Sequence, residues 1–511
     1  MPLLPSSALR KPKPEEHSSS LWTSLGQWFE CCVTRDRPEE LEVVDAHSPI
    51  KQVSRRSVNR NHMIAHHSLT QSLHDSYEVD DTVLGKGGFG IVRRIRFRGC
   101  SDWSRVVKTI QKHKSKELFV KKEIGIIRNL DHPCICRLYE TFEDEEFVHL
   151  VMEYIDGVEL FDYIVSLCAK EIRVDEDFCL NIMRQIFSAL QYCHNRSVIH
   201  RDLKPENIMI KRIESNHAGV KLIDFGLATI VEKRRLSRAP VVNSQTYLSP
   251  EAQQGCFSPA SDMWSSGLVL HVLLLGGVPE RGVLSGETEF VSQTHLLQTV
   301  SPPTATLLDG LLRKDMEKRM TAEEAVAQTR NGHTSADGQL STVPALVRFH
   351  KSNKLRKAAL TAVAMHADSR HLHELEEQFL KADVDGSGQL SKDEIANLVK
   401  QSAMLVNGED FVEYIFKSLD TDGSGKIEYT EWLAAALEVK SDYCESAILA
   451  AFNVFDIDRN GKISSLELGR VLREDQDEIA KLLPQFDVNG DGELDLSEFK
   501  QLLMQTPLIS L

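Results

Sequence analysis

The sequence predicts an α+β domain with two lobes, followed by an all-α domain, and three observations support this fold class. Short apolar alternations typical of strands run from Tyr77 to about Leu150, with one helical segment among them. From about 155 to 330 the apolar spacing becomes helical, and the last third repeats one helix–loop–helix unit four times. A chain of 511 residues is too long for a single hydrophobic core. We therefore expect four segments, bounded as 1–75, 76–330, 331–370 and 371–505.

The first segment, residues 1–75, is rich in Ser, Pro, Arg and His and has no sustained hydrophobic period, so we expect it to be mostly disordered. It contains one apolar island with helical spacing, made of Leu21, Trp22, Leu25, Trp28 and Phe29 and followed by Cys31 and Cys32. An interfacial helix with S-acylated cysteines would give weak membrane association through residues 21–32. A local helix or a docking segment is the alternative. Because Pro rather than Gly follows Met1, N-myristoylation is excluded.

Acidic residues are concentrated in the last segment. Residues 371–511 hold 29 Asp and Glu against 12 Lys and Arg, whereas the whole chain has a net charge of −15. The acids alternate with apolar anchors such as Ile427 and Ile463, which is typical of sites for hard cations rather than of a solvated acidic tail. We expect no nucleic-acid partner.

The cysteine pattern indicates a reducing compartment. The ten cysteines have no framework spacing and no secretory signal precedes them, so we expect free thiols and a cytoplasmic protein, which we take to be a monomer. Cys134 and Cys136 lack a second ligand pair, so a zinc site is not expected. The apolar stretch from Gly267 to Val278 is shorter than the ~20 residues of a membrane span, and we predict a buried core helix there.

A glycine-rich string opens the two-lobed domain. It comprises Gly85, Gly87, Gly88, Phe89 and Gly90, and Val92 follows it. In dinucleotide-binding folds the same spacing of glycines opens a helix. Here the chain continues as a strand, so we predict a flap between two strands. Because glycine lacks a Cβ, the backbone N–H groups of such a flap can approach the phosphates of ATP closely.

Two charged residues follow at the spacing that a phosphate site needs. Lys108 lies on the next predicted strand, where its ammonium would reach the α- and β-phosphates of ATP. Glu123 lies on a predicted helix and is the natural partner to hold that lysine in place.

The most specific string in the chain runs from His200 to Asn207 and reads H-R-D-L-K-P-E-N. Asp202 would accept the proton of a substrate hydroxyl, and Asn207 and Asp224 would each hold a magnesium ion. These strings, in this order, resemble those of protein kinases. The resemblance implies the bilobal protein-kinase fold. Lys204, two residues after Asp202, is the mark of serine/threonine kinases.

The resemblance assigns further positions around the ATP site. Met152 falls at the gatekeeper, and Glu153 to Ile155 form the hinge that faces adenine. Glu159 is placed to contact the ribose and a basic residue of the substrate. In the second lobe, Glu251 would pair with Arg319, and Asp262 begins the helix that anchors the catalytic loop.

Three features depart from the family pattern. Val106 replaces the usual Ala of the adenine pocket, and Asn243 and Ser244 replace Gly-Thr beside the substrate site. Residues 276–306 are shorter than the substrate-facing region of the family. The departures therefore concern substrate docking more than ATP binding.

The fourfold repeat carries oxygen side chains at alternate positions, Gly at the sixth position and Glu at the twelfth, which is the ligand schedule of a calcium-binding EF-hand. The loop spacing indicates two EF-hand pairs. Because the twelfth Glu is bidentate, calcium is favoured over magnesium. The predicted ligands, with a backbone carbonyl at the fourth place of each set, are Asp383, Asp385, Ser387, Gln389 and Glu394; Asp420, Asp422, Ser424, Lys426 and Glu431; Asp456, Asp458, Asn460, Lys462 and Glu467; and Asp487, Asn489, Asp491, Glu493 and Glu498.

Residues 344–366 predict one basic amphipathic helix between the two domains. Its five cations and apolar stripe would suit either a kinase substrate cleft or an opened EF-hand groove. A kinase, a basic junction and four EF-hands in this order resemble the calcium-dependent protein kinases of plants and alveolate protists. The resemblance covers about residues 77–505 and implies an all-α, calmodulin-like domain with four EF-hands.

This resemblance implies a calcium-activated serine/threonine kinase that uses ATP and Mg²⁺. The junction would inhibit the kinase, and Ca²⁺ on the EF-hands would release it. A non-catalytic calcium-responsive scaffold and a calcium-independent kinase are the alternatives, and the junction could instead be a linker that merely packs. Expected substrates carry Ser or Thr near basic residues. Arg234 stands three residues before Ser237, so self-phosphorylation of Ser237 is a further hypothesis.

Overall fold

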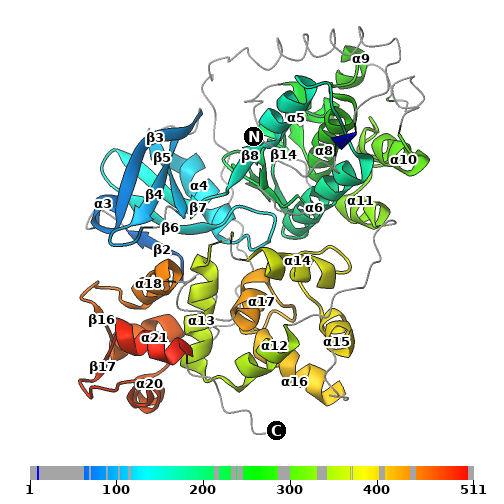
Figure 1. The fold of residues 1–511 in the computed structure, drawn as a ribbon. Coiled ribbons are helices and arrows are strands. Elements are labelled where there is room, and N and C mark those ends of the chain that lie inside the picture. Colours follow the sequence, from blue (N-terminus) through cyan, green and yellow to red (C-terminus); the bar gives the residue numbers. More distant parts are fainter. Residues whose placement is uncertain are drawn as a thin grey trace.

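The computed structural model defines the fold of most of the chain between Met63 and Met504 (Figure 1). Our predictions for residues 21–32, Gly88, Phe89, Asn243 and Ser244 concern positions outside the described residues. The structure describes residues 9–10, 63–67, 71–87, 90–101, 104–112, 117–211, 218–231, 237–238, 245–285, 290, 300–330, 342–368, 370, 372–401, 409–437 and 445–504.

The first lobe is a six-stranded sheet with the strand order β2-β6-β7-β5-β4-β3, and one helix, α4, packs against it (Figure 1). Alternation along β5 points Val107 and Ile110 to opposite faces. Ile110 packs in the same core as Val120 of α4, while Val107 packs with Tyr77 in a second cluster. The elements are β2 (Ala65–His67), β3 (Tyr77–Gly87), β4 (Gly90–Phe97), β5 (Arg105–Gln111), α4 (Glu117–Arg128), β6 (Leu138–Glu143) and β7 (Phe147–Glu153).

The prediction that residues 1–75 are mostly disordered is wrong for their last part. Met63 and Ile64 are buried, and β2 pairs in parallel with β6, with Ala65 opposite Glu140. Polar bonds support this edge strand, because His67 Nε2 lies 2.9 Å from Glu140 Oε2. Because backbone pairing and polar bonds hold this strand, its sequence shows no hydrophobic period from which the strand could have been predicted. Helix α3 (Leu73–Ser76) follows, and near the start of the chain β1 (Leu9–Arg10) pairs with β9 (Arg173–Val174).

The second lobe is mainly helical. The core helix predicted over Gly267–Val278 is confirmed as far as Leu275, where α8 ends, and its side chains Leu268 and Leu270 are buried. The prediction is wrong for the last three residues, because Gly276 has a positive φ and caps the helix. The elements are β8 (Gly157–Glu159), α5 (Leu160–Cys168), α6 (Glu176–Asn195), β10 (Val198–Ile199), β11 (Ile208–Lys211), β12 (Val220–Leu222), β13 (Thr229–Ile230), β14 (Ser237–Arg238), α7 (Pro250–Gln253), β15 (Cys256–Phe257), α8 (Pro259–Leu275), α9 (Arg281–Leu284), α10 (Pro302–Leu311) and α11 (Ala322–Thr329).

The third part is all-α and contains two paired helix–loop–helix units. The loops of each pair meet in a short antiparallel contact, Leu390 with Ile427 in the first pair and Ile463 with Leu494 in the second. The elements are α14 (His373–Ala382), α15 (Lys392–Gln401), α16 (Glu409–Leu419), α17 (Tyr429–Ala436), α18 (Glu445–Phe455), β16 (Lys462–Ser464), α19 (Ser465–Leu472), α20 (Gln476–Leu482), β17 (Glu493–Asp495) and α21 (Leu496–Met504).

The junction forms two helices, so the prediction of a single helix over 344–366 is wrong. Helix α12 (Val343–Lys351) ends at Ser352, whose backbone is extended, and α13 (Lys354–His366) begins after Asn353. The Asn353 side chain accepts a hydrogen bond from the backbone N–H of Arg356 at 2.9 Å, which caps the new helix. Both helices contact α17, and α13 also contacts α18 and α21. The junction therefore lies among the EF-hand helices (Figure 1).

Candidate functional site

Lys108 on β5 connects the two lobes of the catalytic domain. Its Nζ lies 2.7 Å from Glu123 Oε1 on α4 and 2.9 Å from Asp224 Oδ1 in the loop after β12. The predicted pairing of Lys108 with Glu123 is therefore confirmed. Burial opposes a charge on Lys108, but the carboxylates of Glu123 and Asp224 outweigh it and raise the pKa of the ammonium. The lysine thus remains a cation in the position predicted for phosphate binding.

The catalytic loop brings three predicted residues together. The Asn207 side-chain amide donates to the backbone carbonyl of Asp202 at 2.7 Å and to its Oδ2 at 2.9 Å. Lys204 Nζ lies 3.1 Å from the same Oδ2. Both donors orient the Asp202 carboxylate, and an oriented carboxylate can accept a proton from a hydroxyl held within hydrogen-bond reach.

The backbone around this loop is held in uncommon conformations. Arg201 has φ +67° and Asp224 has φ +61°, the left-handed region that side chains other than glycine rarely adopt. The buried carboxylate of Asp262, at the start of α8, accepts the backbone N–H groups of His200 and Arg201, each at 2.9 Å. Phe225 is fully buried and its ring centroid lies 4.7 Å from that of His200. These contacts stabilise a conformation that the local sequence alone would not favour.

The predicted brace of the second lobe is confirmed. Arg319 Nη1 lies 2.6 Å from Glu251 Oε1, and its Nη2 lies 3.0 Å from Glu251 Oε2. This two-pronged pair is nearly enclosed, and Arg319 also donates to the Ala260 carbonyl at 2.8 Å. The pair ties α7, which contains Glu251, to the start of α8 and to the turn before α11.

One hinge residue has side-chain partners that the sequence did not predict. Met152, Glu153 and Ile155 are all buried. The Glu153 carboxylate lies 2.9 Å from Lys221 Nζ and 3.6 Å from Arg137 Nε. Burial alone would raise the pKa of Glu153, but these cations lower it to about 2. The Glu153 side chain is therefore an anionic anchor that pairs with Lys221 and Arg137.

The four predicted calcium loops share one geometry. In each, the first Asp accepts the N–H of the sixth-position Gly, for example Gly388 to Asp383 Oδ2 at 2.8 Å and Gly492 to Asp487 Oδ2 at 2.9 Å. These glycines have positive φ, between +74° and +87°, which explains the residue type. The twelfth Glu folds into its loop, so that Glu394 Oε1 accepts the N–H of Val384 at 2.6 Å. Glu431, Glu467 and Glu498 accept equivalent bonds in their loops.

The donor atoms fit a calcium ion. In the first three loops, one oxygen from each of three carboxylates lies within 4.8 Å of the others: Asp383, Asp385 and Glu394; Asp420, Asp422 and Glu431; and Asp456, Asp458 and Glu467. Burial raises the pKa of Asp383 well above its usual range. A divalent cation would neutralise these crowded carboxylates. The fourth loop has Asn489 where the other loops have their second Asp, but its ligand positions still carry four carboxylates, those of Asp487, Asp491, Asp495 and Glu498.

Comparisons with known proteins agree with this division of the chain. A protein kinase domain family matches residues 77–329, and an EF-hand domain pair family matches residues 373–437 and 445–504. Calcium-dependent protein kinase 3 of Plasmodium berghei is 32% identical over 463 residues, which cover 85% of this chain and 81% of that protein. The chain belongs to the calcium-dependent protein kinase family.

Further relatives span two groups of organisms. Calcium-dependent protein kinase 5 of Plasmodium falciparum is 33% identical over 457 residues, covering 84% of this chain and 78% of the relative. Calcium-dependent protein kinase 34 of Arabidopsis thaliana is 31% identical over 446 residues, covering 82% of this chain and 83% of the relative. This calcium-dependent protein kinase is a calcium-activated serine/threonine kinase that uses ATP, Mg²⁺ and Ca²⁺ and acts on proteins.

In this calcium-dependent protein kinase the first EF-hand pair docks on residues from both lobes of the kinase domain, which sequence reasoning did not predict. Asp131 accepts two bonds at 2.8 Å from Thr430, one from its backbone N–H and one from its hydroxyl. Arg196 Nη2 lies 2.8 Å from Glu428 Oε1, and burial together with Asp131 raises the pKa of Glu428 to about 7. Gly388 of the first loop packs directly against the His132 ring. Glu428 and Thr430 lie inside the second calcium loop, Asp420–Glu431, so docking and calcium binding share residues.

Behind the hinge, Arg137 links the kinase to the junction. It is buried beside Glu153 and donates to the carbonyls of Ala364 at 3.1 Å, Met365 at 3.4 Å and Ala367 at 2.9 Å. These carbonyls end α13, so the guanidinium caps the helix and interacts favourably with its dipole. No local motif marks Arg137 for this role. An arginine among apolar residues just before a strand was the only available signal.

The remaining sequence expectations concern thiols and membranes. Cys134 and Cys136 are buried, and burial raises the pKa of each thiol to about 12, so they pack as neutral groups. Within the described residues, the carboxylate clusters that could hold a metal all lie in EF-hand loops. A search of the described helices finds none that is both long and apolar enough to cross a bilayer.

Replacing the twelfth-position glutamate of a loop by glutamine is expected to remove one calcium ion. The Glu431→Gln variant would keep an amide oxygen for the N–H groups of Thr421 and Asp422 but lose the bidentate anionic ligand. Calorimetric titration is expected to give three bound ions instead of four. Glu498→Gln, in the fourth loop, is the matched comparison. Four ions bound to either variant with unchanged affinity would contradict the ligand assignment.

Proposed function

We propose that calcium controls this kinase by changing what holds the junction helices α12 and α13. When calcium is bound, the EF-hand pairs hold both helices, so the junction stays away from the substrate cleft and the kinase is active. When calcium is absent, the EF-hand pairs release the helices, and the basic junction blocks the kinase. Autoinhibition by the junction is the part of this proposal that goes beyond calcium activation itself.

The contacts of the junction carry this proposal. Arg356 of α13 donates from Nε to the Leu502 carbonyl at 3.2 Å and from Nη2 to the Leu503 carbonyl at 3.0 Å, at the end of α21. Leu355, Ala359 and Val363 of the same helix are fully buried. Because this helix buries its apolar side chains among the EF-hand helices, none of them is free to bind the kinase substrate cleft. Either the EF-hand pairs or the substrate cleft can therefore hold the junction, but not both at once.

The carboxylates of the EF-hand loops explain why calcium favours the state in which the EF-hand pairs hold the junction. In each of the first three loops the three carboxylates repel one another when no cation is bound. Binding of calcium removes this repulsion and favours the open arrangement of a sensor EF-hand pair. The second loop also shares Glu428 and Thr430 with the docking contacts on Arg196 and Asp131. Calcium binding and docking on the kinase would therefore support each other.

The catalytic residues would divide the reaction as follows. Lys108 orients the α- and β-phosphates of ATP, and Glu123 holds its ammonium in place. Asp202 accepts the proton of the attacking Ser or Thr hydroxyl, and Lys204 stabilises negative charge beside it. Asn207 and Asp224 would hold magnesium, which neutralises phosphate charge when bound.

The substrate class follows from acidic groups at the cleft. Glu159 and Glu206 are both half-buried, and burial raises the pKa of each. Asp162 lies near enough to Glu159 to raise its pKa further. Such a cluster gains from a cation, which supports a preference for Ser or Thr near an arginine. The same cluster would attract the five cations of a released junction, so substrate and junction would compete for it.

The test is phosphate transfer from ATP to an Arg-x-x-Ser peptide while free calcium is titrated. We expect a steep rise in rate with calcium that is absent from the Asp224→Ala variant. A flat, active profile would favour the calcium-independent kinase. Activity absent at every calcium concentration would favour the scaffold, which the complete set of Lys108, Asp202 and Asn207 argues against.

A further inference from the structure

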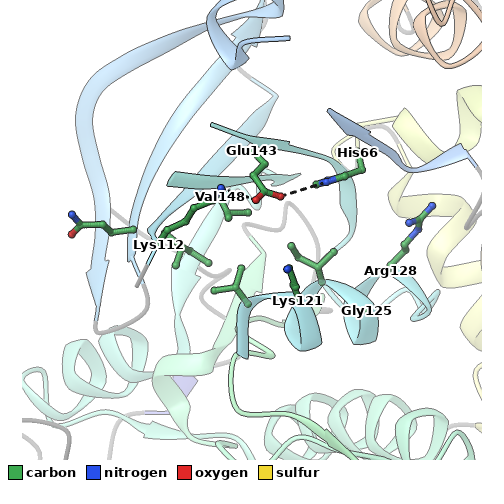
Figure 2. Close-up of a pocket in the computed structure, with 11 residues that line it drawn as sticks. His66, Lys112, Lys121, Gly125, Arg128, Glu143 and Val148 are labelled. Atoms are coloured by element: carbon green, nitrogen blue, oxygen red, sulfur yellow. Dashed lines mark ion pairs between the residues drawn. The ribbon is translucent and has the colours of Figure 1, made fainter. Parts of the chain in front are cut away.

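A cavity of about 320 Å³ lies between α4 and the sheet of the first lobe, outside the nucleotide site (Figure 2). Four apolar side chains form its floor, and these are Ile110, Val120, Ile124 and Val148. Polar and charged side chains also line it, and Figure 2 shows His66, Lys112, Arg128 and Glu143 among them. An apolar floor with a few polar groups at its edge is typical of a ligand-binding pocket.

The cavity lies beside the catalytic ion pair. Ile110 follows Lys108 by two residues on β5, so both side chains point to the same face of the sheet. Val120 and Ile124 lie on α4 on either side of Glu123. An occupant would therefore contact both elements that hold Lys108 and Glu123 2.7 Å apart. It would restrain the position of α4, on which that pair depends.

The rim is basic. Lys112, Lys121 and Arg128 line it together with a single carboxylate, Glu143, which lies 2.6 Å from Lys112 Nζ and 3.5 Å from His66 Nε2. This basic rim would attract an apolar, aromatic ligand that carries acidic groups next to its rings.

We propose that this cavity binds the aromatic segment 21–30 of the same chain. The segment supplies Leu21, Trp22, Leu25, Trp28 and Phe29 at helical spacing. Acid follows at once, because residues 30–45 contain six Asp or Glu against two Arg. Apolar rings match the floor of the cavity, and the acidic continuation matches its rim.

The path of the chain supports an intramolecular ligand. The described structure resumes at Met63 after residue 10, with Met63 and Ile64 buried, and His66 already lines the cavity. Thirty-two residues, 31–62, separate the segment from that point. If this linker behaved as a random coil, its r.m.s. end-to-end distance would be roughly 30 Å, comparable to the size of the lobe. Tethering also gives an effective concentration on the order of millimolar.

Gly125 provides a direct test, because it lines the cavity on an exposed part of α4 and an added Cβ would meet no atom within 4 Å. Gly125→Phe is expected to place a ring in the cavity and exclude the segment. Gly125→Ala is the matched control, since it also replaces the glycine in the helix but does not fill the space.

The experiment is hydrogen exchange of residues 117–128 in the full-length chain at saturating calcium. Trp28→Ala/Phe29→Ala is expected to raise the exchange rate of this helix at least about fivefold. A synthetic peptide of residues 18–32, with Ser at both cysteine positions, is then added to this double variant. The peptide is expected to restore protection when Gly125→Ala is also present, but not when Gly125→Phe is present.

Three outcomes would overturn the proposal. Exchange of residues 117–128 could be unchanged by Trp28→Ala/Phe29→Ala. The peptide could protect the Gly125→Phe and Gly125→Ala proteins equally, so that the cavity is not its site. The peptide could also bind anionic phosphatidylserine vesicles while leaving exchange of α4 unchanged, which would assign the aromatic segment to a lipid surface.

Discussion

Replacing Asp202 by asparagine is expected to lower kcat about 10²–10⁴-fold at saturating calcium, the usual contribution of a general base. Asparagine has the same shape, so an amide oxygen can still accept the bond that Asn207 donates at 2.9 Å. It cannot accept the proton of the substrate hydroxyl. Lys204, now 3.1 Å from Asp202 Oδ2, would lose its anionic partner as well. The measurement is phosphate transfer to an Arg-x-x-Ser peptide under saturating MgATP.

The control is the calcium response of the same variant. Asp202 lies outside the EF-hand domain, so calorimetry should find the same number of calcium ions bound as in the parent protein. A kcat within tenfold of the parent value would show that Asp202 is not the base. Loss of calcium binding together with activity would indicate misfolding instead.

Replacing Arg137 by methionine is expected to raise the calcium concentration for half-activation about 5–150-fold, the usual range of coupling between two sites. Methionine can fill part of the space, but it cannot donate to the carbonyls of Ala364 and Ala367 at the end of α13. It also leaves Glu153 with Lys221 alone. Removing one partner of a buried ion pair typically costs about 3–5 kcal/mol. The arrangement in which α13 is held against the kinase would lose that stabilisation.

Arg98→Met is the matched control, because Arg98 is an exposed arginine of the same lobe whose side chain donates to the His74 carbonyl at 2.6 Å, far from the junction in the sequence. It should leave the calcium titration of activity unchanged. If Arg137→Met gave the same half-activating calcium as Arg98→Met, the link from the hinge to the junction would carry no regulation. Thermal unfolding of both variants separates a regulatory effect from a general loss of stability.

The catalytic-loop and calcium-binding residues could be predicted because their geometry is local. Each EF-hand ligand set spans twelve consecutive residues, and a glycine at the sixth position has the positive φ that the turn requires. The string from His200 to Asn207 likewise folds back on itself, which places Lys204 and Asn207 on Asp202. In both cases, short-range order in the sequence determines which side chains meet.

The junction was predicted only in part, although a local signal was available. Its apolar positions suggested one continuous helix, but Ser352 and Asn353 are residues that favour the start of a helix. The Asn353 side chain caps α13, and the chain turns there so that both helices reach α17. Helical periodicity continues across such a break, so it does not reveal the change in direction.

The sequence by itself determined the two-domain order, the catalytic loop and the four calcium loops, because the residues that form each motif lie close together in the chain. Tertiary structure alone decided that β2 joins the first-lobe sheet, that Glu153 pairs with Arg137 and Lys221, and that Asp131 accepts a hydrogen bond from Thr430. The last pair is separated by 299 residues. Such contacts depend on the packing of whole domains, in which a buried charge must find its partner wherever the fold supplies one.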